Sequence, residues 1–431
     1  MRAIFRNRDF RWLFAGRVVT NIGDSLYFIA AMWLVYNITG DAFYSGLAGF
    51  LTLLPSTLQF LTGPLVDRWD IRRTLVGTQV IQAVVITAIP VADWYGVLTV
   101  ELVLVVMPTL ALINQIVYPA QSAALPRLLD DEELVSANSA FAIAYQGIDM
   151  VANGIAGVFI GLVGAISLFV FDAVTFGLAA LMFAMVTVPT ANVSGAEDDA
   201  SGSDVASTDG GVADDDPDSY LEELRGGLGF LRGTFLMWLI LGVTVVNFIL
   251  GFALATMPAY ADTIDIPSML GVVGAAGAYG ILMGGYAGGN FLGAIGANAV
   301  DGYPLGRIMI VGFTFAGLSA TAAIAVHWLP ITALLIVLAF VPVGVVNVQL
   351  SAVVQSAPPE EFVGRISSVL GSASSVATPF GALAGGAAAS AFGPRIPMFG
   401  LGAGLFLLAT YVILMPGLRG LSRVDQLELQ V

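Results

Sequence analysis

The chain has no cysteine and no lysine, and its single histidine is His327. Without cysteine there can be no disulfide, thiolate metal site or cysteine nucleophile, and one histidine excludes a multi-histidine metal centre. Charged residues make up only 11% of the 431 residues, whereas soluble domains carry about 25%. A water-soluble enzyme is therefore excluded. Because the sequence also lacks a Walker loop and a nucleophile elbow, we expect neither ATP-driven transport nor hydrolysis, and no metal or cofactor.

The net charge of the chain is strongly negative. All 16 basic residues are arginine, 22 of the 31 acidic residues are aspartate, and the net charge is −15. This balance argues against a nucleic-acid partner. An aspartate-rich, lysine-free composition predicts a halophilic, archaeal source with a cytoplasm of very high salt. GC-rich codon usage is the alternative, since it also depletes lysine.

Long apolar runs dominate the chain, which is 57% hydrophobic. A helix of about 20 residues crosses the hydrocarbon core, and only helices or closed barrels satisfy their backbone hydrogen bonds there. We therefore predict an all-α membrane protein with twelve transmembrane helices. The predicted spans are 12–37, 43–66, 74–93, 97–122, 137–163, 166–188, 235–261, 269–299, 307–326, 329–355, 366–392 and 395–416.

The arginines predict the orientation of these spans. With a cytoplasmic N-terminus, 14 of the 16 arginines fall in cytoplasmic segments, leaving only Arg17 within the membrane and Arg395 outside. Cytoplasmic loops are enriched in arginine and lysine. We expect a multi-pass protein of the cell membrane with both termini in the cytoplasm.

One polar segment divides the chain into two six-helix halves, residues 1–188 and 234–431. Residues 189–219 are rich in aspartate, serine and glycine, which predicts a disordered cytoplasmic linker. Residues 220–233 form the pattern of a short amphipathic helix on the membrane surface.

The two halves also repeat each other. Gln-Ser-Ala at 121–123 recurs at 355–357, each followed by a paired-glutamate motif, and Asp67 matches Asp301 at a similar offset. Parallel six-helix repeats are typical of transporters in which two domains rock against each other.

The loop after the second span reads Gly-Pro-Leu-Val-Asp-Arg-Trp-Asp-Ile-Arg-Arg at 63–73. It resembles the signature loop of the major facilitator superfamily, Gly-x-x-x-Asp-Arg-x-Gly-Arg-Arg, with Asp70 in place of the usual glycine. Gly63 would allow close helix contact, and Asp67 could cap the next helix or pair with arginine across the halves. The arginines of this conformational-switch loop are Arg68, Arg72 and Arg73.

Further segments resemble the branch with macrolide-efflux permeases and enterobactin exporters. They are the first helix, Ala124-Leu125-Pro126-Arg127 after the fourth, and Phe171-Asp172-Ala173 in the sixth. The resemblance implies a major facilitator fold and an efflux function. Drug antiporters of the superfamily usually carry a Gly-Pro pair in helix five, whereas Asn-Gly-Ile-Ala-Gly at 153–157 has no proline.

Charges inside the hydrocarbon are costly and mark functional candidates. Arg17, Asn21 and Asp24 share one face of the first helix, with Asp24 about 18 Å along it, near the midplane. Asp149 has a similar depth in the fifth helix. A carboxylate there could take up a proton when desolvated and release it when wet. In the alternative interpretation, Arg17 neutralises one acid permanently.

Two acids are weaker coupling candidates. Glu101 and Asp172 are expected within a turn or two of the outer surface, where both could reach water. The C-terminal spans contain no acid, and their amides are suited to hydrogen bonding with a neutral ligand. The predicted substrate cavity comprises Asn21, Tyr27, Gln146, Asn153, Asn247, Asn290 and Asn347.

Together these features predict a monomeric secondary transporter in the lipid bilayer. It would export a hydrophobic or amphipathic small molecule by alternating access, in exchange for protons or sodium. Uptake or metabolite exchange, and a non-transporting membrane receptor on the same scaffold, are the alternatives.

Overall fold

The computed structural model describes residues 4–61, 69–188, 234–356 and 360–423. Some side chains within these ranges lie outside the description, including Gln146, Asp149, Asn153 and those of 360–370. In the described ranges the backbone is helical apart from short loops and one isolated β-bridge, between Asp265 and Trp328. The all-α expectation is therefore confirmed.

The described ranges place one α-helix within each predicted span, with additional 3-10 segments in the second and eighth spans, which is consistent with the predicted count of twelve. The N-terminal half contains α1 (Arg8–Thr39), α2 (Ala42–Leu53) continued by the 3-10 helix η2 (Leu54–Leu61), α4 (Ile71–Trp94), α5 (Val100–Leu128), α6 (Asp131–Val163) and α7 (Ala165–Ala184). The C-terminal half contains α9 (Phe235–Thr263), α10 (Gly274–Gly296), α11 (Leu305–Val326), α12 (Leu329–Ser356), α13 (Glu360–Phe392) and α14 (Arg395–Leu414), followed by α15 (Pro416–Arg419).

Within the described ranges, eight of these helices are long and apolar enough to cross a membrane on their own. The α-helical part of the second span is shorter than predicted because α2 passes into the 3-10 helix η2, which begins at Leu54. The eighth span is similarly flanked by short 3-10 segments, η3 (Ser268–Val273) and η4 (Ala297–Val300).

Local capping fixes where several helices begin. The Asn7 side chain accepts hydrogen bonds from the backbone of Asp9 and Phe10 and caps α1. Asp70 caps α4, because its Oδ1 accepts from the backbone N–H of Arg73 at 2.7 Å. The aspartate that replaces the usual glycine of the signature loop therefore has a definite structural role.

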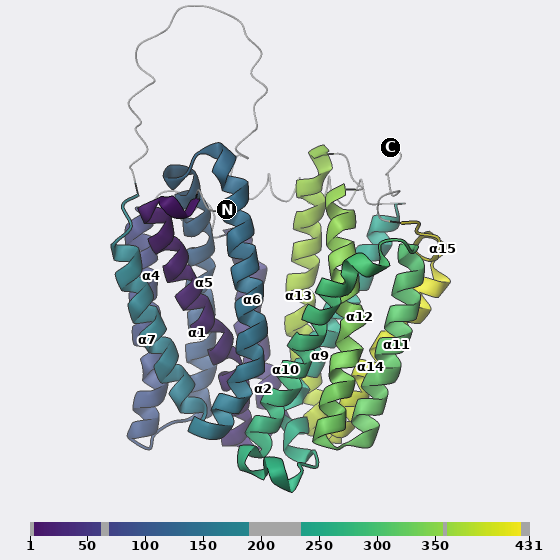
Figure 1. Cartoon of the computed structure of the whole chain (residues 1–431). Coiled ribbons are helices and arrows are strands. Elements are labelled where there is room, and N and C mark those ends of the chain that lie inside the picture. Colours follow the sequence, from purple (N-terminus) through teal and green to yellow (C-terminus); the bar gives the residue numbers. More distant parts are fainter. Residues whose placement is uncertain (1–3, 62–68, 189–233, 357–359, 424–431) are drawn as a thin grey trace, which may run out of the picture.

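The two halves lie side by side and meet at one end (Figure 1). They separate toward the other end, where α1 begins and α12 ends. The contact between the halves is made by α2 against α13 and by α6 against α10. Gly46 and Gly386 allow the backbones of α2 and α13 to touch, since a Cβ on Gly386 would lie 2.6 Å from the Gly46 Cα.

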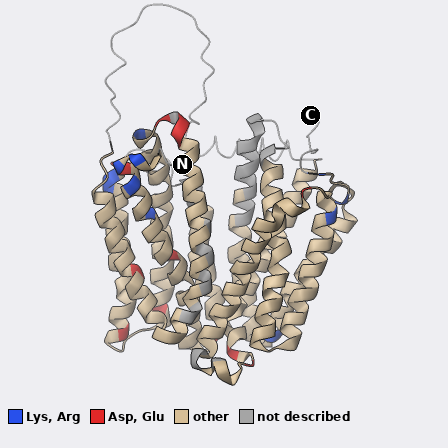
Figure 2. Ribbon diagram, viewed as in Figure 1, with Lys and Arg blue, Asp and Glu red and all other residues tan. Residues whose placement is uncertain are grey.

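A polar contact also joins the halves at this closed end. The Tyr36 hydroxyl donates to Asp262 Oδ2 at 3.1 Å. Arginine residues occur mainly at the opposite, open end of the bundle (Figure 2). The acids Asp41, Asp93, Asp262 and Asp265 all occur in the loops or helix ends of the closed end.

Candidate functional site

A cavity of about 600 Å³ lies between the two halves. Its volume falls within the roughly 300–1,000 Å³ typical of small-molecule sites. The N-terminal half supplies most of its polar lining, from α1 and α5, whereas the C-terminal half supplies Leu254, Met283 and Tyr286. The polar and charged side chains of the wall are Arg17, Asn21, Asp24, Ser25, Thr52, Ser56, Asn114 and Gln115.

Arg17 is held by a polar cluster in the N-terminal half. Its Nε donates to Gln121 Oε1 at 2.6 Å and to the Tyr145 hydroxyl at 3.0 Å, and the guanidinium lies 5.5 Å from the Tyr145 ring centroid. Tyr145 in turn donates to the same oxygen of Gln121 at 2.6 Å. The described hydrogen bonds of Arg17 therefore go to Gln121 and Tyr145 rather than to Asp24.

Asp24 lies on the cavity wall and contacts α5. Its Oδ2 accepts a hydrogen bond from Asn114 Nδ2 at 3.3 Å. Asn114 was not among the predicted site residues, although the polar pair Asn114-Gln115 in an otherwise apolar span is a visible signal. The cavity thus contains a carboxylate supported by a neutral amide.

Asp172 lies behind this wall on α7. It is 0% exposed, so the expectation that it reaches water from the outer surface is wrong. Its Oδ1 accepts from the Thr175 hydroxyl at 2.9 Å, while its Oδ2 is buried without a hydrogen-bond partner. The side chain packs against Gly23, next to Asp24, and the two carboxyl groups are close enough to interact electrostatically. Asp172 is therefore enclosed between α1 and α7, about two turns from the start of α7, with no access to water.

The other predicted coupling and switch residues differ in position. Glu101 is exposed in the first turn of α5, away from the cavity. The side chain of Asp149 lies outside the described residues, as do those of Gln146 and Asn153. Gly63, Asp67, Arg68 and the whole segment 189–233 also lie outside the described residues.

Two arginines of the switch loop are described. Arg72 Nη2 donates to the backbone carbonyl of Ala184, the last residue of α7, where the helix dipole favours a cation. Arg73 contributes the backbone N–H that Asp70 caps. In the C-terminal half, Asp301 Oδ1 accepts from the buried Gln349 Nε2 at 2.7 Å. These contacts connect the loops after the second and eighth spans to neighbouring helices.

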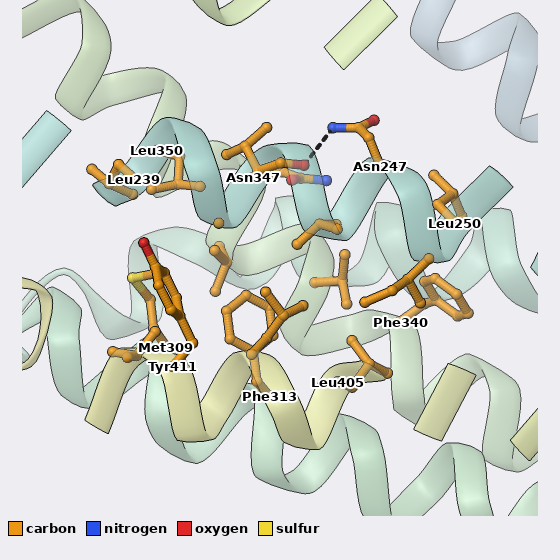
Figure 3. Close-up of a pocket in the computed structure, with 18 of the residues that line it drawn as sticks. Leu239, Asn247, Leu250, Met309, Phe313, Phe340, Asn347, Leu350, Leu405 and Tyr411 are labelled. Atoms are coloured by element: carbon orange, nitrogen blue, oxygen red, sulfur yellow. Dashed lines mark hydrogen bonds between the residues drawn. The ribbon is translucent and has the colours of Figure 1, made fainter. Parts of the chain in front are cut away.

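The predicted cavity residues divide between two cavities. Asn21 and Tyr27 line the central cavity, whereas Asn247, Asn290 and Asn347 line a second pocket inside the C-terminal half. This pocket holds about 90 Å³ between α9, α10, α11, α12 and α14. Figure 3 shows Asn247 and Asn347 along one edge and apolar side chains such as Phe313 and Leu405 filling the remainder. Asn247 donates to the Val243 carbonyl at 2.9 Å, as the dashed line marks.

Comparison with known proteins identifies the class. The fold and the cavity are those of a helical membrane transporter, and the sequence matches the Major Facilitator Superfamily over residues 13–382. The chain belongs to this superfamily. One relative, the multidrug efflux pump Tap of Mycolicibacterium fortuitum, is 25% identical over 429 residues, covering 95% of this chain and 96% of that protein.

Solved structures of other transporters share the fold. An inward-facing, occupied bacterial homologue of the human lysosomal transporter Spinster superposes with a TM-score of 0.69 at 14% identity, covering 95% of this chain and 96% of that chain. The nucleoside transporter NupG superposes with a TM-score of 0.69 at 11% identity, covering 94% of this chain and 98% of that chain. The POT family transporter PepTSo superposes with a TM-score of 0.64 at 13% identity, covering 95% of this chain and 97% of that chain.

Proposed function

We propose that this transporter exports hydrophobic or amphipathic small molecules by alternating access, in exchange for protons. The observation that carries the proposal is a carboxylate, Asp24, on the wall of a drug-sized cavity between the two halves. The name of the relative, a multidrug efflux pump, supports the direction. In this account the molecule binds in the central cavity, and the halves rock about their contact at α2 and α13.

The arginine-rich end of the bundle is cytoplasmic in this proposal, since the positive-inside rule favours that orientation. The halves touch at the opposite end, where Tyr36 bonds to Asp262. The described arrangement then corresponds to a state that receives its substrate from the cytoplasm. Reversal of the rocking would break the Tyr36–Asp262 contact and bring the arginine-rich ends together.

The coupling follows from competition for Asp24. When the cavity faces the cytoplasm, Asp24 releases its proton, and a cationic substrate takes its place beside the carboxylate. When the cavity faces outward, a proton from outside neutralises Asp24 and releases the substrate. Asp172 reinforces this exchange, because two nearby carboxylates in a poorly solvated region resist being ionised together. One proton enters for each substrate cation that leaves.

Flux through reconstituted protein tests the proposal. Proteoliposomes with an amphipathic cationic dye at equal concentration inside and outside should export the dye, and so build up a dye gradient, when an inwardly directed proton gradient is imposed. Asp24→Asn should abolish this uphill export and retain downhill flux, because the cavity remains. Asp93→Asn, at an exposed position at the end of α4, is the matched control and should export normally.

The same vesicles separate the alternatives. Uphill movement of the dye driven by a sodium gradient but not by a proton gradient would mean that sodium, not the proton, is the coupled ion. Saturable dye binding without any flux would indicate a receptor. Uphill export by Asp24→Asn equal to that of the unmodified protein would overturn the role assigned to Asp24.

A further inference from the structure

The central cavity and the C-terminal pocket share one wall residue. Tyr286 of α10 lines both. Its ring packs edge-on against Phe340 at a centroid distance of 4.7 Å, and Phe340 itself lines the C-terminal pocket. The backbone carbonyl of Tyr286 accepts from Asn290 Nδ2 at 3.1 Å. A single aromatic side chain thus lies at the boundary between the two spaces.

The two spaces differ in chemistry. The central cavity carries its charge on the N-terminal side, where Asp24 accepts from Asn114. The C-terminal pocket has no charged residue among those that line it. Apart from three asparagines, its lining is mainly apolar and includes buried side chains such as Phe313 and Leu408. From Asp24 to Leu408 the surroundings therefore change from anionic to uncharged and mainly apolar across Tyr286. A molecule that occupied both spaces would need a cationic group at one end and an apolar group at the other.

We infer that the exported molecule is such a bipartite cation, with its charged group beside Asp24 and an apolar arm inserted past Tyr286 into the C-terminal pocket. This inference rests on the proposed export function and specifies its substrate class. The space of about 90 Å³ is far below the roughly 300 Å³ of the smallest drug-sized sites, so the pocket takes only a short arm. The remainder of the molecule stays in the central cavity.

The pocket predicts a stepwise dependence of affinity on arm length. Each methylene that becomes buried should tighten binding roughly fourfold. The affinity should stop increasing with chain length once the pocket is full. The probe is a series of alkyltrimethylammonium ions from tetramethylammonium upward, with dissociation constants measured on the purified full-length protein in nanodiscs.

Substitutions on α14 locate the arm. Leu408 lines the pocket and is 2% exposed, whereas its neighbour Leu407 is 67% exposed on the outside of the helix bundle. In Leu408→Trp the larger side chain should fill the pocket, so that affinity stops increasing at a shorter alkyl chain. In Leu408→Ala the affinity should continue to increase up to a longer alkyl chain. Leu407→Trp, the matched control, should leave the length dependence unchanged. Unaltered tetramethylammonium binding in each variant verifies that the protein is folded and the cation site intact.

Two results would overturn the inference in distinguishable ways. If Leu408→Trp and Leu408→Ala bind tetramethylammonium normally and keep the same length dependence, the arm does not occupy this pocket. If the protein exports neutral amphipaths uphill but binds none of the cations, the substrate class and the competition of a cation for Asp24 are wrong, and only uphill export itself stands. Absence of uphill export for both groups of compounds would overturn the proposed function as well.

Discussion

Gly23 of α1 packs directly against the carboxyl group of Asp172 of α7. A side chain at position 23 would overlap both Asp172 Oδ1 and the Thr175 hydroxyl that donates to it. The glycine therefore lets the fully buried carboxyl group of α7 reach the backbone of α1 beside Asp24. This close approach connects a cavity residue to an acid that has no access to the cavity surface.

Gly23→Ala should consequently destabilise the protein. The added methyl group must displace Asp172 or separate α1 from α7, and overpacking of this kind costs about 1–3 kcal/mol. Gly77→Ala on α4 is the matched control, because a Cβ there meets nothing within 4 Å. The control should be neutral or slightly stabilising, since alanine favours a helix over glycine by roughly 0.5–1 kcal/mol. Thermal unfolding in detergent compares the two; equal midpoints would contradict the packing described here.

The Arg17 cluster should behave as a unit. Removing Gln121 or Tyr145 leaves a buried guanidinium short of partners, and Arg17→Ala leaves a buried amide oxygen without its charged donor. Each single truncation should cost about 1–3 kcal/mol. The double variant Arg17→Ala with Gln121→Ala should cost clearly less than the sum of the single changes. Strict additivity in a chemical-denaturation cycle would mean that the two side chains do not interact.

The spans were predictable from the sequence because long apolar runs have only one common solution in a bilayer. The partners of buried polar groups were not. Gln121 and Tyr145 are 104 and 128 positions from Arg17, so no local spacing reveals that they meet. Access to water was misjudged for Asp172 because counting along one helix gives its distance from the helix end but not which face turns inward. Likewise, Asn247 and Asn21 looked equivalent as intramembrane amides, yet helix packing assigns them to separate cavities.

The contact at the closed end should influence the conformational equilibrium. Tyr36→Phe removes the hydrogen bond to Asp262, and a hydrogen bond of this kind contributes about 0.5–1.5 kcal/mol. The population should shift roughly 2- to 10-fold away from the described state. Since the chain has no cysteine, two cysteines introduced at the exposed positions Val135 and Tyr303 can be spin-labelled without background labelling. The distance between the labels then reports the separation of the two halves. An unchanged distance distribution between the labels would exclude this contact as a latch.

The composition makes its own prediction. If the aspartate-rich, lysine-free sequence reflects a high-salt cytoplasm, the unfolding temperature should rise steadily with KCl from low to molar concentrations. Screening of the net charge of −15 supplies the physical reason. A salt-independent unfolding temperature would favour codon usage as the origin of the composition.

The pH dependence of ligand affinity tests the central claim most directly, namely that substrate and proton compete for Asp24. For a cationic ligand on the purified protein, affinity should weaken by up to about tenfold per unit as the pH falls through the titration of the carboxyl group. In Asp24→Asn the affinity should be lower throughout and independent of pH over that range. The same pH dependence in Asp24→Asn as in the unmodified protein would show that the exchanged proton resides elsewhere and would contradict the account.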